Sequence, residues 1–264
     1  MLFFPHVLSG PVLRLRDIAE RLDNLRGRRF DGREAALGSI VFVIGLLKKT
    51  LLADPLASVV GPAFAEPSAL SPLAAWTAAL AWSFELYFDF SGYSDMAIGL
   101  SRLFGVTLPL NFHSPYKAVN IIDFWRRWHM TLSRFLRDYL YVPLGGNRKG
   151  PARRYVYLMI TMVLGGLWHG AGWTFVLWGA LHGAYLAINH GWQALRLRIG
   201  HDLKTSCALG RAGSCLLTFT AVVLAWVVFR ANDITAAMAM FKAMAGCNGF
   251  VLPDFWLPKW GAFG

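Results

Sequence analysis

The apolar residues between Asn120 and Pro143 repeat with the period of an α-helix and form one broad face. At about 100° per residue, that face contains Ile121, Phe124, Trp125, Trp128, Leu132, Phe135, Leu136, Tyr139 and Leu140. Asn120 can cap the first turn, and Pro143 can end the helix. The sequence therefore predicts an amphipathic helix over residues 120–143.

The opposite face of this amphipathic helix is charged. Asp123 with Arg127, and Arg134 with Asp138, are pairs of opposite charge four residues apart, a spacing that supports a helix. His129 is an exception to this separation of polar and apolar residues, because it lies on the apolar face. A titratable group on a buried face needs either a hydrogen-bond partner or a chemical role.

Apolar runs alternate with basic segments along the rest of the chain, as in membrane proteins. Residues 14–35 carry many arginines and predict a cytoplasmic segment. The other predicted elements are a short membrane helix over 37–53, a loop over 54–72, a span over 70–88, a helical hairpin over 155–189, a span over 214–229, and an amphipathic helix after residue 231. The fold class that follows is all-α and polytopic.

The hairpin is predicted from charge and length together. Basic residues flank 155–189 on both sides, so both ends belong on one side of the membrane. Two complete crossings need about 40 residues, and this segment is shorter. Its turn, at His169–Ala171, is therefore expected inside the protein at membrane depth. Non-helical backbone is tolerated there only where it is buried in protein or lines a cavity.

Composition supports a membrane protein. Of 264 residues, 56% are hydrophobic, and the mean hydropathy is +0.44. The net charge of +11 arises from clusters that flank apolar runs, which indicates cytoplasmic loops and lipid headgroups and excludes a nucleic-acid-binding domain. The three cysteines form no CxxC motif and predict neither a metal site nor a disulfide framework.

The candidate chemistry centres on His129 and His169. A neutral imidazole can accept the proton of a hydroxyl that attacks a thioester carbonyl. No GxSxG elbow or reactive-cysteine signature is present, which favours direct transfer over an acyl-enzyme. The two histidines are alternatively metal ligands, but no HExxH or close His/Asp cluster accompanies them, so we predict no metal. The other histidines, His182 included, have ordinary interpretations such as a helix face with a hydrogen bond.

Two further features leave alternatives open. Glu85 and Asp89 lie at or near membrane depth, where carboxylates usually face protein or a water-filled cavity. Alternatively, Asp89 and Asp95 lie at the interface and cap local backbone. The glycine-rich basic stretch PLGGNRKGPARR has two interpretations. It either binds an anionic group or anchors the cytoplasmic side of the protein through its positive charge. Its residues do not follow the order of a P-loop, which favours the anchor.

Three stretches carry a resemblance to a known family: YFDFSGYSDMAIGLSRLFG, LNFHSPYKAVNIIDFWRRWHMTLSRFLRDYLYVPLGGNRKG and GLWHGAGWTFVLWGALHG. They resemble the membrane-bound O-acyltransferase (MBOAT) family, in the branch of the alginate O-acetylation membrane protein. The resemblance implies short, tilted and broken helices around a central tunnel. It also implies that the family's catalytic histidine falls on His169 and its second position on His129. We hypothesise that His169 is a general base and that His129 positions or polarises the reacting group.

The resemblance also implies substrates and partners. The donor is a cytoplasmic thioester such as acetyl-CoA, used as a substrate, with no permanently bound cofactor. Exported acetyltransferase partner proteins pass the acyl group to a polysaccharide acceptor, alginate in this branch. The implied location is the bacterial inner membrane, in contact with the lipid bilayer. The predicted substrate-binding residues are Arg126, Arg127, Trp128, Trp168 and Asp89.

Family members extend further at both ends. We therefore expect residues 1–264 to form a single transmembrane domain of this type that is incomplete at both ends. D-alanyl or peptidoglycan acyl transfer are alternative functions within the family. A membrane transport subunit that relays protons, and an inactive truncated homologue, are alternatives from other classes.

Overall fold

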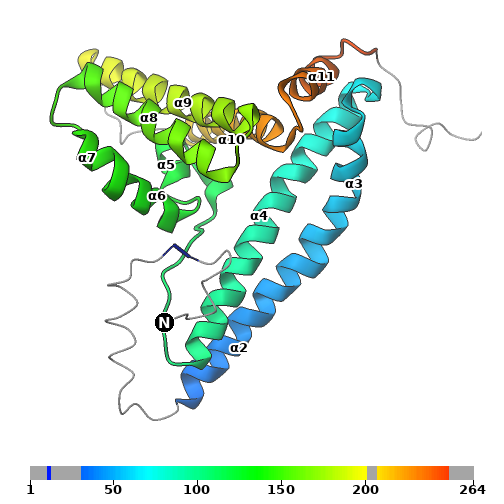
Figure 1. Ribbon diagram of the computed structural model, residues 1–264, viewed down its shortest axis with the longest axis vertical. Helices are drawn as coiled ribbons and strands as arrows, with labels where there is room; N and C mark the ends of the chain where they lie inside the picture. Colours follow the sequence, from blue (N-terminus) through cyan, green and yellow to red (C-terminus); the bar gives the residue numbers. More distant parts are fainter. Residues whose placement is uncertain (1–10, 13–30, 201–206, 250–264) are drawn as a thin grey trace, which may run out of the picture.

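The computed structural model describes residues 11–12, 31–200 and 207–249, and every regular element in these ranges is a helix (Figure 1). The predicted all-α fold is confirmed for this part of the chain. Most of the basic segment predicted over 14–35 lies outside the described residues. Two of the described helices are long and apolar enough to cross a membrane, namely Gly32–Ala65 and Ala208–Arg230.

The first long helix consists of α2 (Gly32–Leu47), a π-helical segment (Lys48–Ala53) and α3 (Asp54–Ala65). The loop predicted over 54–72 is therefore wrong for most of its length. Pro55 removes one backbone donor and normally disturbs a helix at this point. The chain widens into a π-helix immediately before it, so the helix continues to Ala65.

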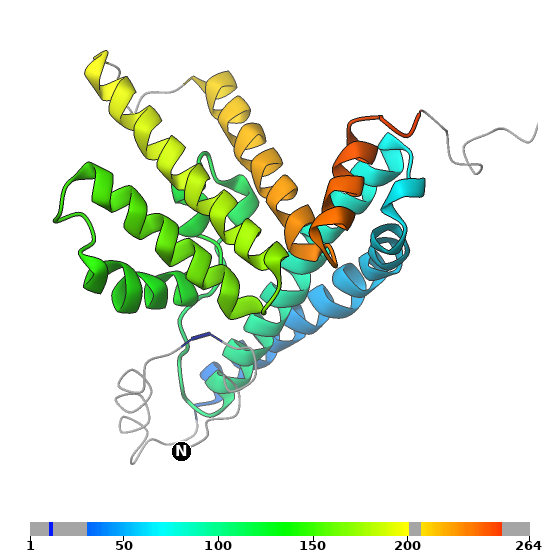
Figure 2. The ribbon, with the colours of Figure 1, turned by 45° about the horizontal axis from the view of Figure 1, so that its top comes forward.

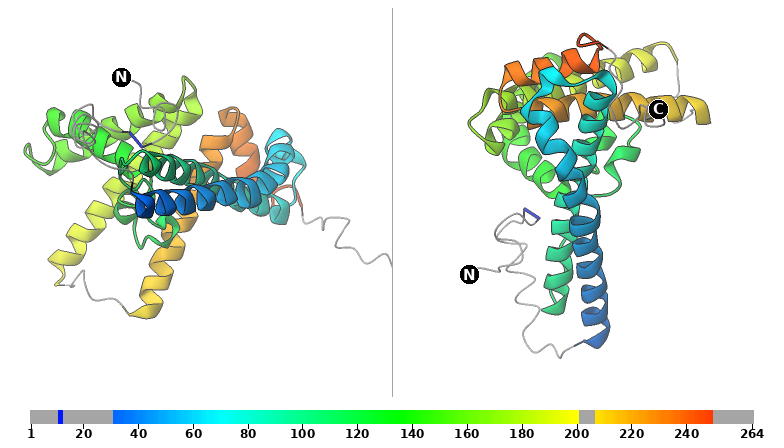
Figure 3. Two further views of the ribbon diagram at one scale, coloured as in Figure 1. Left: turned by 90° about the horizontal axis from the view of Figure 1, so that it is seen from below. Right: turned by 90° about the vertical axis from the view of Figure 1, so that its right-hand side faces the viewer.

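Helix α4 (Pro72–Leu103) runs antiparallel to α2, and the two form a long arm of the molecule (Figure 3, right). A Cβ atom added at Gly45 would lie 2.5 Å from the carbonyl oxygen of Gly92, so the two backbones touch. Helix α4 extends well past the predicted span over 70–88 because its carboxylates find partners on the neighbouring helix. The pairs are Lys48–Asp95 (2.5 Å), Lys49–Asp89 (2.6 Å) and, within the first long helix, Lys49–Asp54 (2.7 Å).

The remaining helices gather beside the upper part of α4 (Figure 2). They are α5 (Ile121–Trp125), α6 (Met130–Leu136), a π-helical segment (Arg137–Tyr141), α7 (Val142–Leu144), α8 (Pro151–His169), α9 (Trp173–Arg198), α10 (Ala208–Arg230) and α11 (Ile234–Met244). Two 3-10 turns, Pro67–Ala69 and Pro115–Lys117, complete the set. Helices α8 and α9 form two arms joined at Gly170–Gly172, so the predicted hairpin is present. Its bounds are wrong, because the arms have 19 and 26 residues and extend beyond 155–189 at both ends.

The helix predicted over 120–143 is wrong as a continuous element. Helix α5 ends at Trp125, and His129 adopts a left-handed conformation (φ 41°) before α6 begins. The loop before α5 takes over the hydrogen bonds that a continuous helix would make. The carbonyl of Arg127 accepts from the backbone N–H of His113 (2.9 Å), and the N–H of Met130 donates to the carbonyl of Asn111 (2.9 Å).

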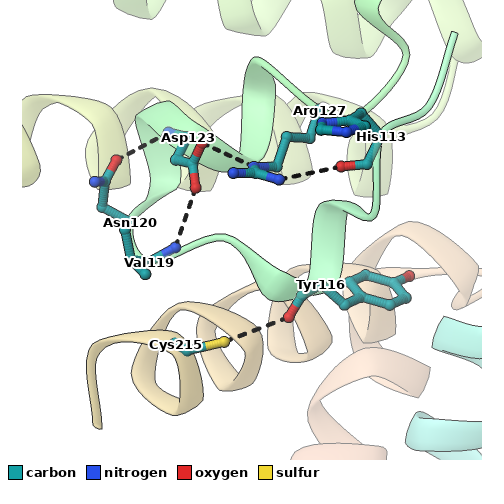
Figure 4. Close-up of polar contacts among 7 residues, drawn as sticks. All are labelled: His113, Tyr116, Val119, Asn120, Asp123, Arg127 and Cys215. Carbon is teal, nitrogen blue, oxygen red and sulfur yellow. Dashed lines mark hydrogen bonds and ion pairs between the residues drawn. The ribbon is translucent and has the colours of Figure 1, made fainter. Parts of the chain in front are cut away.

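The start of this broken helix is as expected. The side chain of Asn120 accepts from the backbone N–H of Asp123 (2.9 Å), which confirms the predicted cap. Figure 4 shows Asp123 accepting from Arg127 Nε (2.8 Å) and from the backbone N–H of Val119 (3.3 Å). The Asp123–Arg127 pair is therefore confirmed, whereas Asp138 forms its salt bridge with Arg137 (2.8 Å).

The loop between α4 and α5 is held by hydrogen bonds to α4 and to α10. The Tyr116 hydroxyl donates to the carbonyl of Ser83 in α4 (2.5 Å), and burial raises the pKa of Tyr116, which keeps it a neutral donor. The carbonyl of Tyr116 accepts from the Cys215 thiol of α10 (3.5 Å; Figure 4). A mostly aromatic core then fills the space between α4, α5, α9 and α10, with Phe124, Trp178 and Trp226 almost fully buried.

Candidate active site

His129 and His169 line one small cavity with a volume of about 40 Å³. That space is comparable to one or two water molecules. Its walls come from α4, the α5–α6 region, α8, α9 and α10. The lining residues are Leu86, Phe90, Trp125, Trp128, His129, Leu132, His169, Trp178, Trp226 and Phe229. Two imidazoles separated by 40 residues of chain thus meet in an apolar, aromatic enclosure.

His129 is 3% exposed and sits at the backbone bend between α5 and α6. Its Nδ1 lies 3.1 Å from Oδ1 of Asn111. Its ring and that of Phe90 pack edge-to-face, with 4.7 Å between the ring centroids. Within the described part of the chain, His129 is therefore held by its hydrogen bond to Asn111 and by aromatic packing.

His169 is the last residue of α8 and is half-buried. Its ring packs edge-to-face against Phe229 (5.1 Å), Trp178 (5.4 Å) and Trp168 (5.0 Å). Among the described residues, no hydrogen bond orients this imidazole. With no partner among the residues that the structure describes, its nitrogens are suited to a ligand in the cavity.

The close approach of α8 and α9 sets the position of His169. A Cβ atom added at Gly166 would lie 2.2 Å from the carbonyl oxygen of Phe175, and one at Gly179 would lie 2.4 Å from that of Met162. Glycine is required at both positions for the backbones to touch. This contact brings Trp178 of α9 next to the end of α8, where it packs against the His169 ring.

Of the other predicted site residues, the two tryptophans lie beside the histidines, and the two arginines lie at the bend between α5 and α6. Trp128 is buried and lines the cavity, and Trp168 contacts the His169 ring but is 61% exposed. Arg126 is exposed at the bend. Arg127 is engaged by Asp123 and by the His113 carbonyl (3.4 Å), so it braces the local backbone.

Asp89 is not brought to the cavity. Its carboxylate pairs with Lys49 on the side of α4 that faces the first long helix. The Asp89 side chain is about half exposed, so this carboxylate is paired on the surface of the two helices and is not buried in protein. The partner is a lysine from the neighbouring helix.

Sequence reasoning missed three residues around the two histidines. Asn111 is 1% exposed and contacts His129, and its sequence signal is a single amide between Leu110 and Phe112. Trp178 supports His169. His182 was expected to have a hydrogen bond, but within the described part of the chain neither of its ring nitrogens has a partner. It is fully buried, with Trp178 at 4.9 Å and Phe124 stacked on it at 6.1 Å.

This arrangement is suited to moving a proton between small reactants in a water-poor space. Apolar walls strengthen electrostatic interactions inside the cavity and exclude competing water. Two imidazoles on one cavity can accept a proton from one group and orient another. Among the described residues, no three His, Cys, Asp or Glu side chains gather where they would hold a metal ion.

Comparison with known proteins gives one family match and several close relatives. The family described as MBOAT, membrane-bound O-acyltransferase family, matches residues 1–238. A peptidoglycan O-acetyltransferase of Helicobacter pylori is 44% identical over 250 residues, covering 95% of this chain and 46% of that protein. A probable alginate O-acetylase of Azotobacter vinelandii is 45% identical over 253 residues, covering 95% of this chain and 48% of that protein.

A more distant relative is a teichoic acid D-alanyltransferase of Streptococcus thermophilus. It is 31% identical over 259 residues, covering 89% of this chain and 61% of that protein. The chain spans about half the length of the first two relatives. The shared region contains both histidines and the cavity that they line.

Proposed function

This chain belongs to the membrane-bound O-acyltransferase family, and from that membership we propose that the protein moves an acetyl group from a cytoplasmic thioester towards hydroxyl groups of an exported polysaccharide. Relatives named alginate O-acetylase and peptidoglycan O-acetyltransferase support acetyl as the group transferred. The acceptor proposed first is alginate, because that name recurs among relatives at 44–46% identity. Peptidoglycan is the second candidate, because a relative at 44% identity carries that name.

The observation that carries this proposal is the cavity shared by His129 and His169. In the proposed reaction, His169 takes the proton of the acceptor hydroxyl as the oxygen attacks the thioester carbonyl. The new C–O bond forms, the C–S bond breaks, and the departing thiolate receives the proton that His169 took, which returns the imidazole to its neutral form. No covalent acyl-enzyme is required, so the cavity needs room only for the reacting centre.

The size of the cavity supports a short acyl group. A volume of about 40 Å³ is too small for a long acyl chain, which needs an extended channel, and acetyl is the short acyl group that the names of the relatives indicate. We propose acetyl-CoA as the donor. Arg126, which is exposed, is the better of the two neighbouring arginines to attract an anionic donor, because Arg127 is engaged by Asp123.

The setting proposed for this reaction is the bacterial inner membrane. The whole protein is proposed to be multi-pass, with its helices around a central tunnel that joins the cytoplasmic donor to the outer face. Exported acetyltransferase partners would then deliver the acyl group to the polymer. The two apolar helices Gly32–Ala65 and Ala208–Arg230 support insertion in a bilayer.

Transfer of labelled acetyl groups tests this function. Membranes that contain the full protein and its partners are supplied with acetyl-labelled acetyl-CoA and with alginate or peptidoglycan. We expect alkali-labile label on alginate, because O-acetyl esters are hydrolysed by base. Label on peptidoglycan alone would mean that the acceptor is peptidoglycan and not alginate. Absence of label on either polymer, together with proton flux across the membrane, would favour the transport alternative and contradict the proposal.

A further inference from the structure

We propose that Asn111 is a positioning residue that fixes the tautomer of His129, so that His129 presents an unprotonated Nε2 as a hydrogen-bond acceptor to the reactants. This inference rests on the proposed acyl transfer for its catalytic consequence. The tautomer itself follows from geometry alone. Asn111 lies in the loop before α5, 18 residues from the histidine that it contacts.

The orientation of the Asn111 amide is fixed by two donors. The backbone N–H of Thr131 points at Oδ1 (3.3 Å), and a backbone N–H can only donate. The Thr131 hydroxyl lies 2.9 Å from the same Oδ1 and accepts the backbone N–H of Val12 (2.9 Å), which leaves its own hydrogen to donate. On its other side, the Asn111 amide nitrogen donates to Oγ of Ser94 (3.2 Å). A flipped amide would place NH₂ against a donor, so the oxygen faces His129.

The tautomer follows directly. An amide oxygen carries lone pairs and no hydrogen, so the hydrogen between it and His129 Nδ1 belongs to the imidazole. A neutral imidazole has one N–H, and the other nitrogen is then an acceptor. Nε2 is the nitrogen left to act on the cavity that the ring lines.

This assignment specifies the role of His129. A residue that polarises the acyl carbonyl must donate a hydrogen bond to its oxygen, which neutral His129 in this tautomer does not do. It instead accepts, from the attacking hydroxyl or from an N–H of His169. Among the described residues, His169 of α8 is the one other titratable side chain that lines the cavity. Helix α4 presents Phe90 and α10 presents Trp226 and Phe229.

Asn111 also holds the bend that aims the imidazole. The left-handed backbone at His129 (φ 41°) is unfavourable for a residue with a side chain. Two hydrogen bonds to Asn111 stabilise it: Met130 N–H to the backbone carbonyl, and Thr131 N–H to the side chain. One residue therefore determines both the direction and the protonation pattern of His129.

Two variants of Asn111 test the inference in the full protein. Asn111→Asp keeps an acceptor for His129 and Thr131, and Ser94 can turn its hydroxyl to donate to the second carboxylate oxygen. A carboxylate beside an imidazole favours the charged form, so the acid limb of kcat/KM against pH should move upward by about one unit or more. Asn111→Leu removes the acceptor, and we expect kcat to fall by about 10²-fold with KM nearly unchanged. Asn189→Asp is the matched control, because Asn189 accepts from Gln193 (3.1 Å) on α9 and does not line the cavity, and its pH profile should coincide with that of the wild type.

A spectroscopic readout separates positioning from folding. In protein with ¹⁵N-labelled histidine, the signals lost in His129→Gln identify His129, and they should show a protonated Nδ1 and an unprotonated Nε2. A protonated Nε2 in the wild type, or an Asn111→Asp profile that coincides with the wild-type profile, would overturn the inference. If Asn111→Leu fails to fold, the Asp variant and the spectrum decide. If the wild type shows no acyl transfer, the proposed function fails, while the spectrum still tests the tautomer.

Discussion

Replacing His169 by glutamine should lower acetyl transfer by about 10²–10⁴-fold, the range that a general base contributes. Glutamine retains a polar side chain of similar reach but cannot accept the hydroxyl proton. The ring is half-buried and is oriented by aromatic packing, with no hydrogen bond among the described residues, so its loss should leave the surrounding structure intact. The measurement is kcat for labelled-acetyl transfer at equal amounts of membrane-inserted protein.

His190→Gln is the matched control for this experiment. His190 is also half-buried, but it lies on α9 against Arg154 (2.7 Å) and does not line the cavity. Its replacement should change kcat by less than about threefold, within the range of substitutions that disturb no named feature. Equal losses in the two variants, or full activity in His169→Gln, would remove His169 from the chemistry.

Gly179→Ala should have the second largest effect. Its Cβ would lie 2.4 Å from the Met162 carbonyl, which forces α9 away from α8. Overpacking of this kind costs about 1–3 kcal/mol, and a displacement near 1 Å at a catalytic group can cost about 10²-fold in rate. We therefore expect a lower melting temperature in detergent and a loss of kcat greater than the loss of folded protein explains.

Gly191→Ala in the same helix provides the comparison. A Cβ at Gly191 meets nothing within 4 Å, so the substitution adds helix propensity without a clash. It should leave kcat unchanged and keep or raise the melting temperature. Similar behaviour of the two variants would show that the backbone contact between α8 and α9 does not position His169.

Local signals in the sequence predicted several elements correctly. The Asn120 cap and the Asp123–Arg127 pair depend on residues three or four apart, and both are present. The turn at the end of α8 followed from the charge on both flanks, although the helices on either side are longer than predicted. Such features need no knowledge of distant parts of the chain.

The errors arose where distant residues override local pattern. Periodicity favoured one helix through His129, but the loop at Asn111 and His113 competes for its backbone hydrogen bonds. The charges near membrane depth gave no sign of their partners, because Lys49 and Asp89 are 40 positions apart. Asn111 likewise has no local pattern that links it to the imidazole.

In the candidate site, too, local sequence signals identified single residues but not their contacts with distant parts of the chain. His129 and His169 were singled out because each was expected to violate a local rule, His129 on an apolar face and His169 beside a turn at membrane depth. That their rings line a single cavity depends on how α4, α8, α9 and α10 pack, which no spacing reveals. The support from Trp178 and the buried position of His182 depend on the same packing.

A double-mutant cycle on the two histidines tests the central claim most directly. kcat/KM is measured for His129→Gln, His169→Gln and the double variant at one pH and equal folded protein. If both imidazoles serve one proton transfer, the double variant should lose little more than the worse single variant, since residues that act as a unit are strongly non-additive. Losses that multiply in the double variant would mean that the histidines act independently, and would contradict a shared site.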